Sequence, residues 1–306
     1  MKIAVLGAGA MGSLFGGYLS QHNDVWMVDV NSQRVQAINE KGVTIAEKDR
    51  ENVYTPRAVT DTSQLGEMDL VIVFVKAMFT LDALTHNRHL IGKDTYVMTL
   101  QNCAGHETKL LQFADADHVL IGTTQHNSSI ISDGHIKHGG GGKTTIGILG
   151  GNSERVQHIA DNFASCGIET TVSNNIKKQI WTKLFLNTAA SSLTAVLQVP
   201  LGFILDDPYA CSMMERLARE AVAVANVEGA AQFDAEEIIS DIKTVLANAK
   251  GGYTSIYADL KNGVRTEVDT ISGSVVALAK RLGVPVPCHE FVVLMIHAFE
   301  DKAQIK

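Results

Sequence analysis

The chain has 306 residues, of which 45% are hydrophobic and 19% charged, and it carries a formal net charge of −7. This length allows two domains with separate cores, and the acidic balance argues against a nucleic-acid or anionic-membrane partner. No run of 18 or more apolar residues occurs, so we expect no transmembrane helix. The four cysteines are scattered, without a Cys-x-x-Cys pair or histidines at metal spacing, which indicates reduced thiols in a cytoplasmic protein and no bound metal.

The first predicted element is an apolar strand that runs into a glycine turn, Gly7-Ala8-Gly9-Ala10-Met11-Gly12. In a Gly-x-Gly-x-x-Gly turn the first glycine allows the bend and the second lets backbone N–H groups approach a diphosphate. The third glycine lets the following helix pack on the strand. Because a strand precedes the turn and an amphipathic run follows it, the motif predicts a dinucleotide site at the helix N-terminus. Since residues 2–12 already form this unit, we expect no signal peptide.

Asp29 ends the second predicted strand, residues 25–28, and stands 22 positions after Gly7. A carboxylate at this point accepts hydrogen bonds from the adenosine ribose hydroxyls and repels a 2′-phosphate, which favours NAD over NADP. Arg34 lies five residues further on and could still reach a phosphate. The residues alone therefore predict an NAD(P)H site with a preference for NAD.

Short apolar runs alternate with helical or turn-rich stretches over residues 1–173, the pattern of a parallel sheet with crossover helices. We predict central strands over residues 69–76, 95–100 and 119–124. Lys76 and Asn102 stand at the carboxyl ends of the first two, where such sheets bind their ligands. Each also has a purely structural interpretation, Lys76 as the strand's exit into solvent and Asn102 as a turn residue.

A glycine run at residues 139–142 separates two strand-like segments, 135–138 and 144–149. We interpret the three segments as an antiparallel hairpin added to the sheet. A second phosphate loop is the less favoured alternative, because no helix follows the glycines. A helix over 153–166 and a strand over 169–172 complete this domain.

Helical periodicity replaces strand patterns from residue 174 onward. We therefore predict an α/β Rossmann-type nucleotide-binding domain over residues 1–173, followed by an all-α substrate domain over 174–306. Helices are expected near residues 176–197, 207–229, 234–249, 253–262, 266–282 and 288–302. Ligands bind outside the carboxyl ends of the strands in such sheets, so we expect the site in a cleft between the domains.

Lys183, Asn187 and Ser191 are spaced i, i+4 and i+8 on the first of these helices, which places them on one face. Apolar residues surround that face, and an ammonium in such a setting needs a polar partner. A substrate carbonyl or carboxylate would serve as that partner. The alternative is an ordinary solvated lysine.

A third polar block contains Ser255 and the segment 265–269. Thr266 and Asp269 resemble a capping box, so we expect a helix to begin at Thr266. Glu267 in its first turn is favoured by the helix dipole even without a function.

With these blocks in hand, the chain resembles the ketopantoate reductase family, the 2-dehydropantoate 2-reductases, over essentially its whole length. The resemblance is carried by the glycine turn, Val75-Lys76, Gln101-Asn102, Trp181-Thr182-Lys183-Leu184 with Asn187, and Ser255 with Arg265-Thr266-Glu267-Val268-Asp269. It implies NAD(P)H-dependent reduction of a 2-oxo acid to a D-2-hydroxy acid, with ketopantoate or a related branched or aromatic oxo acid as substrate. Its metabolic setting would then be pantothenate biosynthesis.

The same resemblance implies roles for single residues. Lys183 would be the general acid, and Asn187 and Ser255 would hold the polar groups of the substrate. Asn102 would lie near the nicotinamide and the substrate. Finally, Lys76 and Glu267 would line the cofactor and active-site cleft.

Two departures from the family pattern bear on the substrate. Cys103 replaces the usual glycine after Asn102, and Ser191 replaces a second asparagine one turn beyond Asn187. A hydroxyl in place of an amide removes reach and one donor, so we expect a pocket that differs from one made for ketopantoate. The residue Ser191 therefore favours other branched or aromatic D-2-hydroxy acids. Many family members use NADPH, which opposes the preference indicated by Asp29.

Three alternatives stay open at this point. The chain is an NAD-dependent D-2-hydroxy-acid dehydrogenase that does not act on ketopantoate, another two-domain dehydrogenase with the same turn, or a non-catalytic NAD(P)-sensing protein. A polar stripe with a proton donor argues against the sensor. The apolar helices after residue 207 serve equally well for a homodimer interface or as internal core.

Overall fold

The computed structural model describes residues 1–101, 104–150 and 153–303, and its contacts divide the chain into two compact units. The N-terminal unit comprises residues 1–101 and 106–176. The C-terminal unit comprises residues 177–303 together with the short segment 104–105. The first unit is α/β and the second is largely helical, which confirms the predicted fold class.

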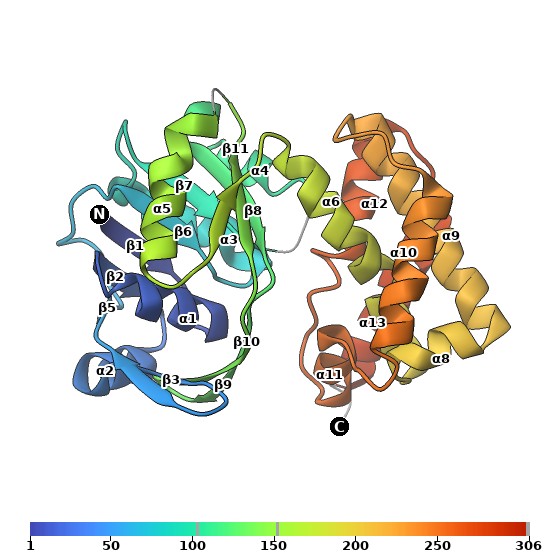
Figure 1. The fold of residues 1–306 in the computed structure, drawn as a ribbon, viewed down its shortest axis with the longest axis horizontal. Coiled ribbons are helices and arrows are strands. Elements are labelled where there is room, and N and C mark those ends of the chain that lie inside the picture. The colour runs from blue at the N-terminus through green and yellow to red at the C-terminus, as the bar shows by residue number, and fades with distance from the viewer. Residues whose placement is uncertain (102–103, 151–152, 304–306) are drawn as a thin grey trace. The chain divides into compact units, whose positions relative to one another are not determined.

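The N-terminal unit is built on an eight-stranded sheet of order β12-β11-β8-β7-β6-β1-β2-β5 (Figure 1). Its strands are β1 (Lys2–Leu6), β2 (Asp24–Val28), β5 (Arg57–Val59), β6 (Leu70–Val73), β7 (Tyr96–Thr99), β8 (Val119–Thr124), β11 (Thr144–Ile148) and β12 (Thr170–Val172). All neighbouring pairs are parallel except β8 and β11. Strand β6 is completely buried, as its β-branched sequence predicts. The crossovers contain α1 (Ala10–Leu19), α2 (Ser32–Lys41), α3 (Thr80–His86), α4 (Glu107–Leu110) and α5 (Gln157–Ser165).

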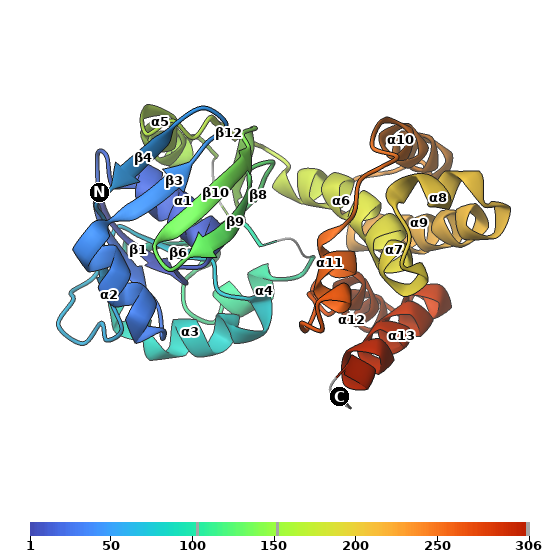
Figure 2. The same cartoon turned by 90° about the horizontal axis from the view of Figure 1, so that it is seen from below.

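A second, four-stranded sheet covers helix α1 (Figure 2). Its order is β4-β3-β10-β9, with β3 (Val43–Ala46), β4 (Glu51–Tyr54), β9 (Asn127–Ser132) and β10 (His135–Gly140). Helix α1 packs against the main sheet at β1 and β2 and against the second sheet at β9 and β10. Because it has a sheet on either side, α1 is buried continuously from Gly12 to Leu19.

The predicted hairpin around the glycine run is wrong. Strand β10 pairs with β9 and β3, whereas β11 pairs with β8 and β12 in the other sheet. The glycines therefore link two sheets and do not close a turn between paired strands. The true partner of β10 is β9, which is mostly exposed. Its sequence of polar residues followed by the adjacent pair Ile130-Ile131 lacks the alternation that identifies a strand.

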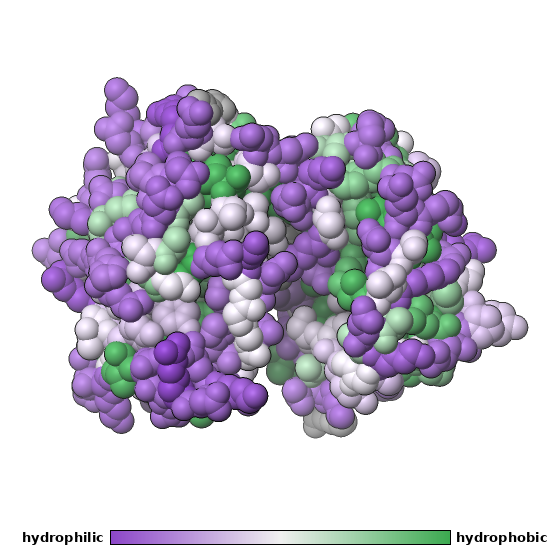
Figure 3. Space-filling model, in the orientation of Figure 1, coloured by the Kyte–Doolittle hydropathy of each residue, from purple (hydrophilic) through white to green (hydrophobic). Residues whose placement is uncertain are grey.

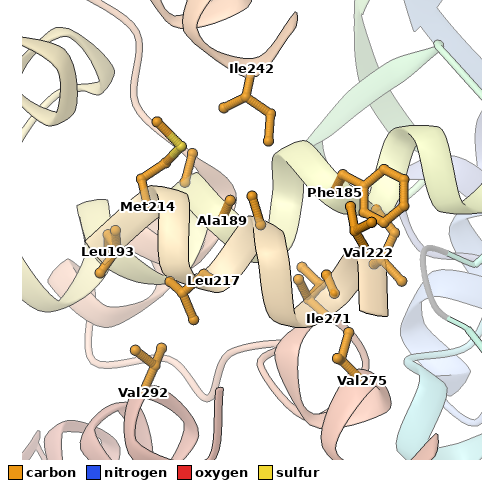
Figure 4. Packing of buried hydrophobic residues seen from close by; sticks show 14 of the residues in the cluster. Phe185, Ala189, Leu193, Met214, Leu217, Val222, Ile242, Ile271, Val275 and Val292 are labelled. Carbon is orange, nitrogen blue, oxygen red and sulfur yellow. The ribbon is translucent and has the colours of Figure 1, made fainter. Parts of the chain in front are cut away.

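The C-terminal unit is a bundle of helices around one apolar core (Figures 1 and 4). It contains α6 (Ile176–Leu186), a π-helical turn (Asn187–Ser191), α7 (Ser192–Leu197), α8 (Leu201–Asp206), α9 (Pro208–Glu228), α10 (Ala235–Asn248), α11 (Ser255–Lys261), α12 (Ser272–Leu282) and α13 (Pro287–Ala303). Phe185, Ala189 and Leu193 project from the α6–α7 segment into this core (Figure 4). There they meet side chains of α9, α10, α12 and α13, so α6–α7 is the central helical segment of the unit.

Two helix predictions need correction. The expected helix over 176–197 is interrupted by the π-helical turn, and the expected helix over 266–282 begins only at Ser272. Thr266 does not cap a helix, because the residues that follow it form turns and α12 begins only at Ser272. Its hydroxyl accepts from the Val268 N–H at 3.2 Å, and its own N–H and hydroxyl both donate to Glu300 Oε1 at 2.7 Å. That contact with α13 joins residues 34 positions apart, and helical periodicity carries no signal for it.

The surfaces of the two units are mixed in polarity. Figure 3 shows hydrophilic side chains over most of the visible face of the N-terminal unit, and apolar areas among them on the C-terminal unit. Exposed apolar side chains of α8 and α9 include Phe203, Tyr209 and Met213. Among the described residues, no helix is both long and apolar enough to cross a membrane.

Candidate functional site

The glycine turn joins β1 to α1 and depends on two of its glycines for its shape. Gly7 has φ of +101°, and a Cβ added to it would lie 2.7 Å from the backbone nitrogen of Val75. A Cβ on Gly12 would lie 1.8 Å from the carbonyl oxygen of Gly7. A Cβ on Gly9 would meet no atom within 4 Å. The space beside the N-terminus of α1 is therefore open at Gly9, which suits a diphosphate approaching the backbone N–H groups.

Asp29 lies next to this turn, and its carboxylate contacts it directly. Oδ2 accepts a hydrogen bond from the N–H of Ala8 at 2.8 Å, and Oδ1 accepts one from the N–H of Asn31 at 2.9 Å. Arg34 Nη1 also donates to Oδ2 at 3.2 Å, and the Asp29 side chain is only 10% exposed. A carboxylate has about four acceptor positions, so three donors leave capacity for a ribose hydroxyl. Asp29 thus fits the expected cofactor role and in addition supports the turn.

Arg34 is held by a second carboxylate that sequence reasoning did not single out. Its Nε donates to Oδ1 of Asp133 at 3.0 Å, and the Arg34 side chain is 20% exposed. Asp133 belongs to the two-residue turn Asp133-Gly134 between β9 and β10. An Asp-Gly pair is a strong hairpin signal, and it could have located this turn in the sequence.

The carboxyl ends of β6 and β7 are tied together by Gln101. Its Nε2 donates to the carbonyl oxygen of Val75 at 2.6 Å, and its Oε1 accepts from the Thr99 hydroxyl at 2.8 Å. Lys76 follows Val75 directly and is exposed, at the start of a 3-10 turn. Asn102, expected beside Gln101, lies outside the described residues. The structural role of Gln101 was not recognised from the motif that contains it.

Lys183 lies on α6 between the buried side chains Trp181 and Leu184. The indole N–H of Trp181 donates to Glu228 of α9 at 2.6 Å, which fixes α6 on the longest helix of the bundle. Lys183 is itself mostly buried, and this burial lowers its pKa from 10.5 to about 8. The amine and the ammonium are then both accessible near neutral pH, as a group that donates and accepts protons requires.

Asn187 and Ser191 mark the two ends of the π-helical turn that follows α6. Single π-helical turns inside α-helices occur frequently at functional sites. Asn187 is half-buried, and Ser191 is 7% exposed. Lys183, Asn187 and Ser191 therefore lie on one continuous helical segment, although that segment is not the regular α-helix expected from their spacing.

The N-terminus of α11 is fixed against this turn, and Ser255 is the first residue of α11. Thr254, the N-cap, donates from its hydroxyl to the Ser191 carbonyl oxygen at 3.4 Å and lies 2.8 Å from the Thr194 hydroxyl. The structure therefore brings the helix ends that carry Asn187, Ser191 and Ser255 together within one unit. Thr254 was not singled out in sequence, because a capping threonine is common without any function.

Glu267 is half-buried in the non-helical segment that precedes α12. Helix α13 holds this segment on either side of Glu267, through Glu300 at Thr266 and through His297 at Asp269. His297 lies 2.9 Å from both Glu300 Oε2 and Asp269 Oδ1. Burial lowers the pKa of His297, but its hydrogen bonds to Glu300 and Asp269 outweigh burial and raise it overall. The helix-dipole interpretation of Glu267 does not apply, since no helix begins there.

Comparison with known proteins decides the family. The family model described as ketopantoate reductase PanE/ApbA matches residues 3–151, and the model of its C-terminal domain matches residues 175–300. The chain belongs to the ketopantoate reductase family. The resemblance stated from sequence motifs is thereby confirmed, and the chain is an NAD(P)-dependent oxidoreductase acting on CH–OH groups.

Relatives in this family match nearly the whole chain. A 2-dehydropantoate 2-reductase of Halobacterium salinarum is 33% identical, with 94% of this chain and 95% of the relative covered. One from Pyrococcus abyssi is also 33% identical, with 94% of both chains covered. Among solved structures, D-mandelate dehydrogenase with NADH and anilino(oxo)acetate is similar, with a TM-score of 0.91 and 32% identity over 100% of both chains.

Proposed function

We propose that this enzyme reduces a 2-oxo acid to a D-2-hydroxy acid with NADH. In this proposal the N-terminal unit binds the dinucleotide and the C-terminal unit binds the substrate and supplies the proton. The observation that carries the proposal is the mostly buried Lys183, whose pKa is lowered to about 8, within a member of this family. A non-catalytic sensor would need no such group.

The proposed reaction needs one hydride on the carbonyl carbon and one proton on the carbonyl oxygen. The reduced nicotinamide supplies the hydride when it is bound. Lys183 as an ammonium donates a hydrogen bond to the carbonyl oxygen and then its proton, as negative charge develops there. The side chains of Asn187, Ser191 and Ser255 orient the carboxylate and the neighbouring polar group of the substrate.

The cofactor site is proposed at the glycine turn, residues 7–12. Its backbone N–H groups would hold the diphosphate, and Asp29 would accept hydrogen bonds from the adenosine ribose hydroxyls. In the same proposal Lys76 and Glu267 line the cofactor, and Asn102 lies near the nicotinamide. The NADH bound to the similar D-mandelate dehydrogenase supports NADH as the cofactor.

Two substrate classes have specific support. The relatives named 2-dehydropantoate 2-reductase support ketopantoate, whereas Ser191 and the similarity to D-mandelate dehydrogenase support an aromatic or bulky branched oxo acid. We favour the second class, because a serine has less reach than the asparagine that the family pattern has at this position. Initial rates with ketopantoate, ketoisocaproate, phenylglyoxylate and pyruvate, each with NADH and NADPH, test the proposed function. They also test the expected preference for aromatic or bulky branched oxo acids over ketopantoate. Failure to oxidise either cofactor with any oxo acid would contradict the proposed function.

Substituting Ser191→Asn is expected to shift the preference toward ketopantoate. The longer amide adds one donor and occupies space next to Asn187, so the ratio of kcat/KM for ketopantoate to that for phenylglyoxylate should rise by roughly 10-fold or more. Because Ser191 is buried, thermal unfolding must accompany the kinetics. The matched control is Thr182→Asn, an exposed position on the preceding helix. An unchanged ratio in a folded variant would remove Ser191 from the substrate pocket.

The two directions of the reaction should have opposite pH profiles around the pKa of Lys183. Oxo-acid reduction needs the ammonium, so its kcat/KM should fall as the pH rises through about 8. Hydroxy-acid oxidation needs the neutral amine, so its kcat/KM should rise through the same pH. Initial rates in both directions between about pH 6 and about pH 10 measure this. Profiles that run in parallel would assign the proton transfer to another group.

We also propose a cytoplasmic location, which fits the free thiols of Cys166, Cys211 and Cys288. A homodimer through the C-terminal helices stays a prediction. Light scattering at several protein concentrations measures the mass in solution.

A further inference from the structure

Arg34 forms ion pairs with two carboxylates, Asp29 and Asp133, beside the proposed cofactor site. We propose that Asp133, on the turn between β9 and β10, makes the enzyme select NAD(H) against NADP(H) by holding the Arg34 guanidinium away from a 2′-phosphate. This inference rests on the proposed dinucleotide site at the glycine turn. It assigns selectivity to a residue that lies outside the β1–α1–β2 unit in which the cofactor motif is found.

The ion pair of Arg34 lies where the adenosine ribose is expected. Asp29 accepts from the N–H of Ala8 within the glycine turn, so its carboxylate marks the place of the adenosine ribose. Arg34 donates to this same carboxylate through Nη1 and to Asp133 through Nε. The guanidinium is thus engaged on two sides, directly beside the expected 2′-position.

The backbone of Asp133 is fixed. Strands β9 and β10 pair at Ser132 and His135, which leaves only Asp133 and Gly134 in the turn. Gly134 has φ of +74°, and a Cβ on it would lie 3.2 Å from the carbonyl oxygen of Gly42, just after α2. The carbonyl oxygen of Gly134 accepts from the N–H of Thr44 at 2.8 Å. Arg34 therefore faces a carboxylate held by the second sheet and not a freely moving loop.

The net charge around Arg34 is negative. Two carboxylates and one guanidinium leave one net negative charge at this place, and the three side chains are 10–34% exposed. This negative charge does not oppose the binding of neutral ribose hydroxyls. A 2′-phosphate would add about two negative charges where the nearest cation is already paired. Asp133 thus engages a guanidinium that would otherwise compensate that phosphate.

Asp133→Asn tests the inference, because it removes the charge and keeps both the volume and a residue favoured in this turn. The probes are 5′-AMP and 2′,5′-ADP, which differ only by the 2′-phosphate. Calorimetric titration of the full chain should show 2′,5′-ADP binding roughly tenfold more tightly in the variant, with 5′-AMP changed less than about twofold. The ratio of NADP⁺ to NAD⁺ affinity should move in the same direction.

Two further variants make the result specific. Asp94→Asn removes the same charge from an exposed turn that precedes β7, and it should leave both affinities unchanged. Adding Arg34→Ala to Asp133→Asn should abolish the gain, because the gain requires the released guanidinium. If Asp133→Asn matches Asp94→Asn, or if the gain survives without Arg34, the inference is overturned. If the unaltered chain binds neither 5′-AMP nor NAD⁺, the proposed dinucleotide site itself is wrong.

Discussion

Lys183→Met is expected to lower the turnover number for oxo-acid reduction by roughly 10²–10⁴-fold. The methionine keeps most of the volume but offers no proton, so the alkoxide would have to take its proton from water. NADH binding should change little, because the proposed diphosphate and ribose contacts at the glycine turn and Asp29 belong to the other unit. Steady-state kinetics and a titration with NADH, made on the same preparation, separate the two effects.

The same variant should not lose stability, and this distinguishes a functional lysine from a structural one. Burial lowers the pKa of Lys183 from 10.5 to about 8, which corresponds to a cost of about 3 kcal/mol for the folded ammonium. The unfolded chain binds this proton more tightly, so the cost is fully present below about pH 8. It disappears as the pH rises toward 10.5. Chemical denaturation should therefore find Lys183→Met at least as stable as the original at pH 7, with the difference shrinking at higher pH.

Lys178→Met is the matched control, since Lys178 is an exposed lysine of the same helix. It should leave the turnover number within about twofold and the unfolding free energy within about 0.5 kcal/mol. Near-normal turnover in Lys183→Met would show that another residue is the acid. A large loss of stability in Lys183→Met would indicate that the ammonium serves the fold.

Two substitutions in the glycine turn should separate an effect on stability from an effect on cofactor binding. Gly12→Ala places a Cβ 1.8 Å from the carbonyl oxygen of Gly7, and only a backbone shift of α1 can relieve this contact. We expect a loss of at least about 3 kcal/mol in the free energy of unfolding. Gly9→Ala meets no atom within 4 Å, and its φ of −69° and ψ of −168° suit any residue. Its stability should stay within about 0.5 kcal/mol of the original.

Gly9→Ala should nevertheless weaken NADH binding by roughly 10- to 100-fold, because its methyl group fills the space through which the diphosphate approaches the backbone. Thermal unfolding without ligand and calorimetric titration with NADH measure the two properties. Gly66→Ala is the control, because Gly66 also has open space where a Cβ would be and lies in a loop distant in sequence from the turn. Unchanged NADH affinity in Gly9→Ala would contradict the proposed diphosphate site.

The sequence predicted those parts of the molecule that depend on local patterns. Strand β1, the glycine turn, α1 and Asp29 follow one another in the chain, and each constrains the next within a few residues. Helices α9, α10 and α13 were predicted to within two residues at each end, because each is long and periodic.

The parts that failed depend on contacts between distant segments. Thr266 looked like a helix cap, but turns follow it, and its N–H and hydroxyl bind Glu300, 34 positions away. The four-stranded sheet was missed because β9 is exposed and its polar and apolar residues do not alternate, and β10 was then paired with the wrong strand. Asp133 shows the same limit at the candidate site. Its importance arises only from Arg34, which is 99 positions earlier in the chain.

The π-helical turn at Asn187–Ser191 bears on how this enzyme can change over evolutionary time. Such a turn accommodates one residue more than an α-helical turn, so deletion of a single codon would restore a regular helix. The wider turn absorbs this residue locally, so after such a deletion the helix on either side would keep its face, and the threonine contacts that anchor α11 would be retained. Only the spacing of polar side chains within the turn, from Asn187 to Ser191, would change. Deletion within this turn is therefore tolerated by the fold and acts on the polar spacing alone.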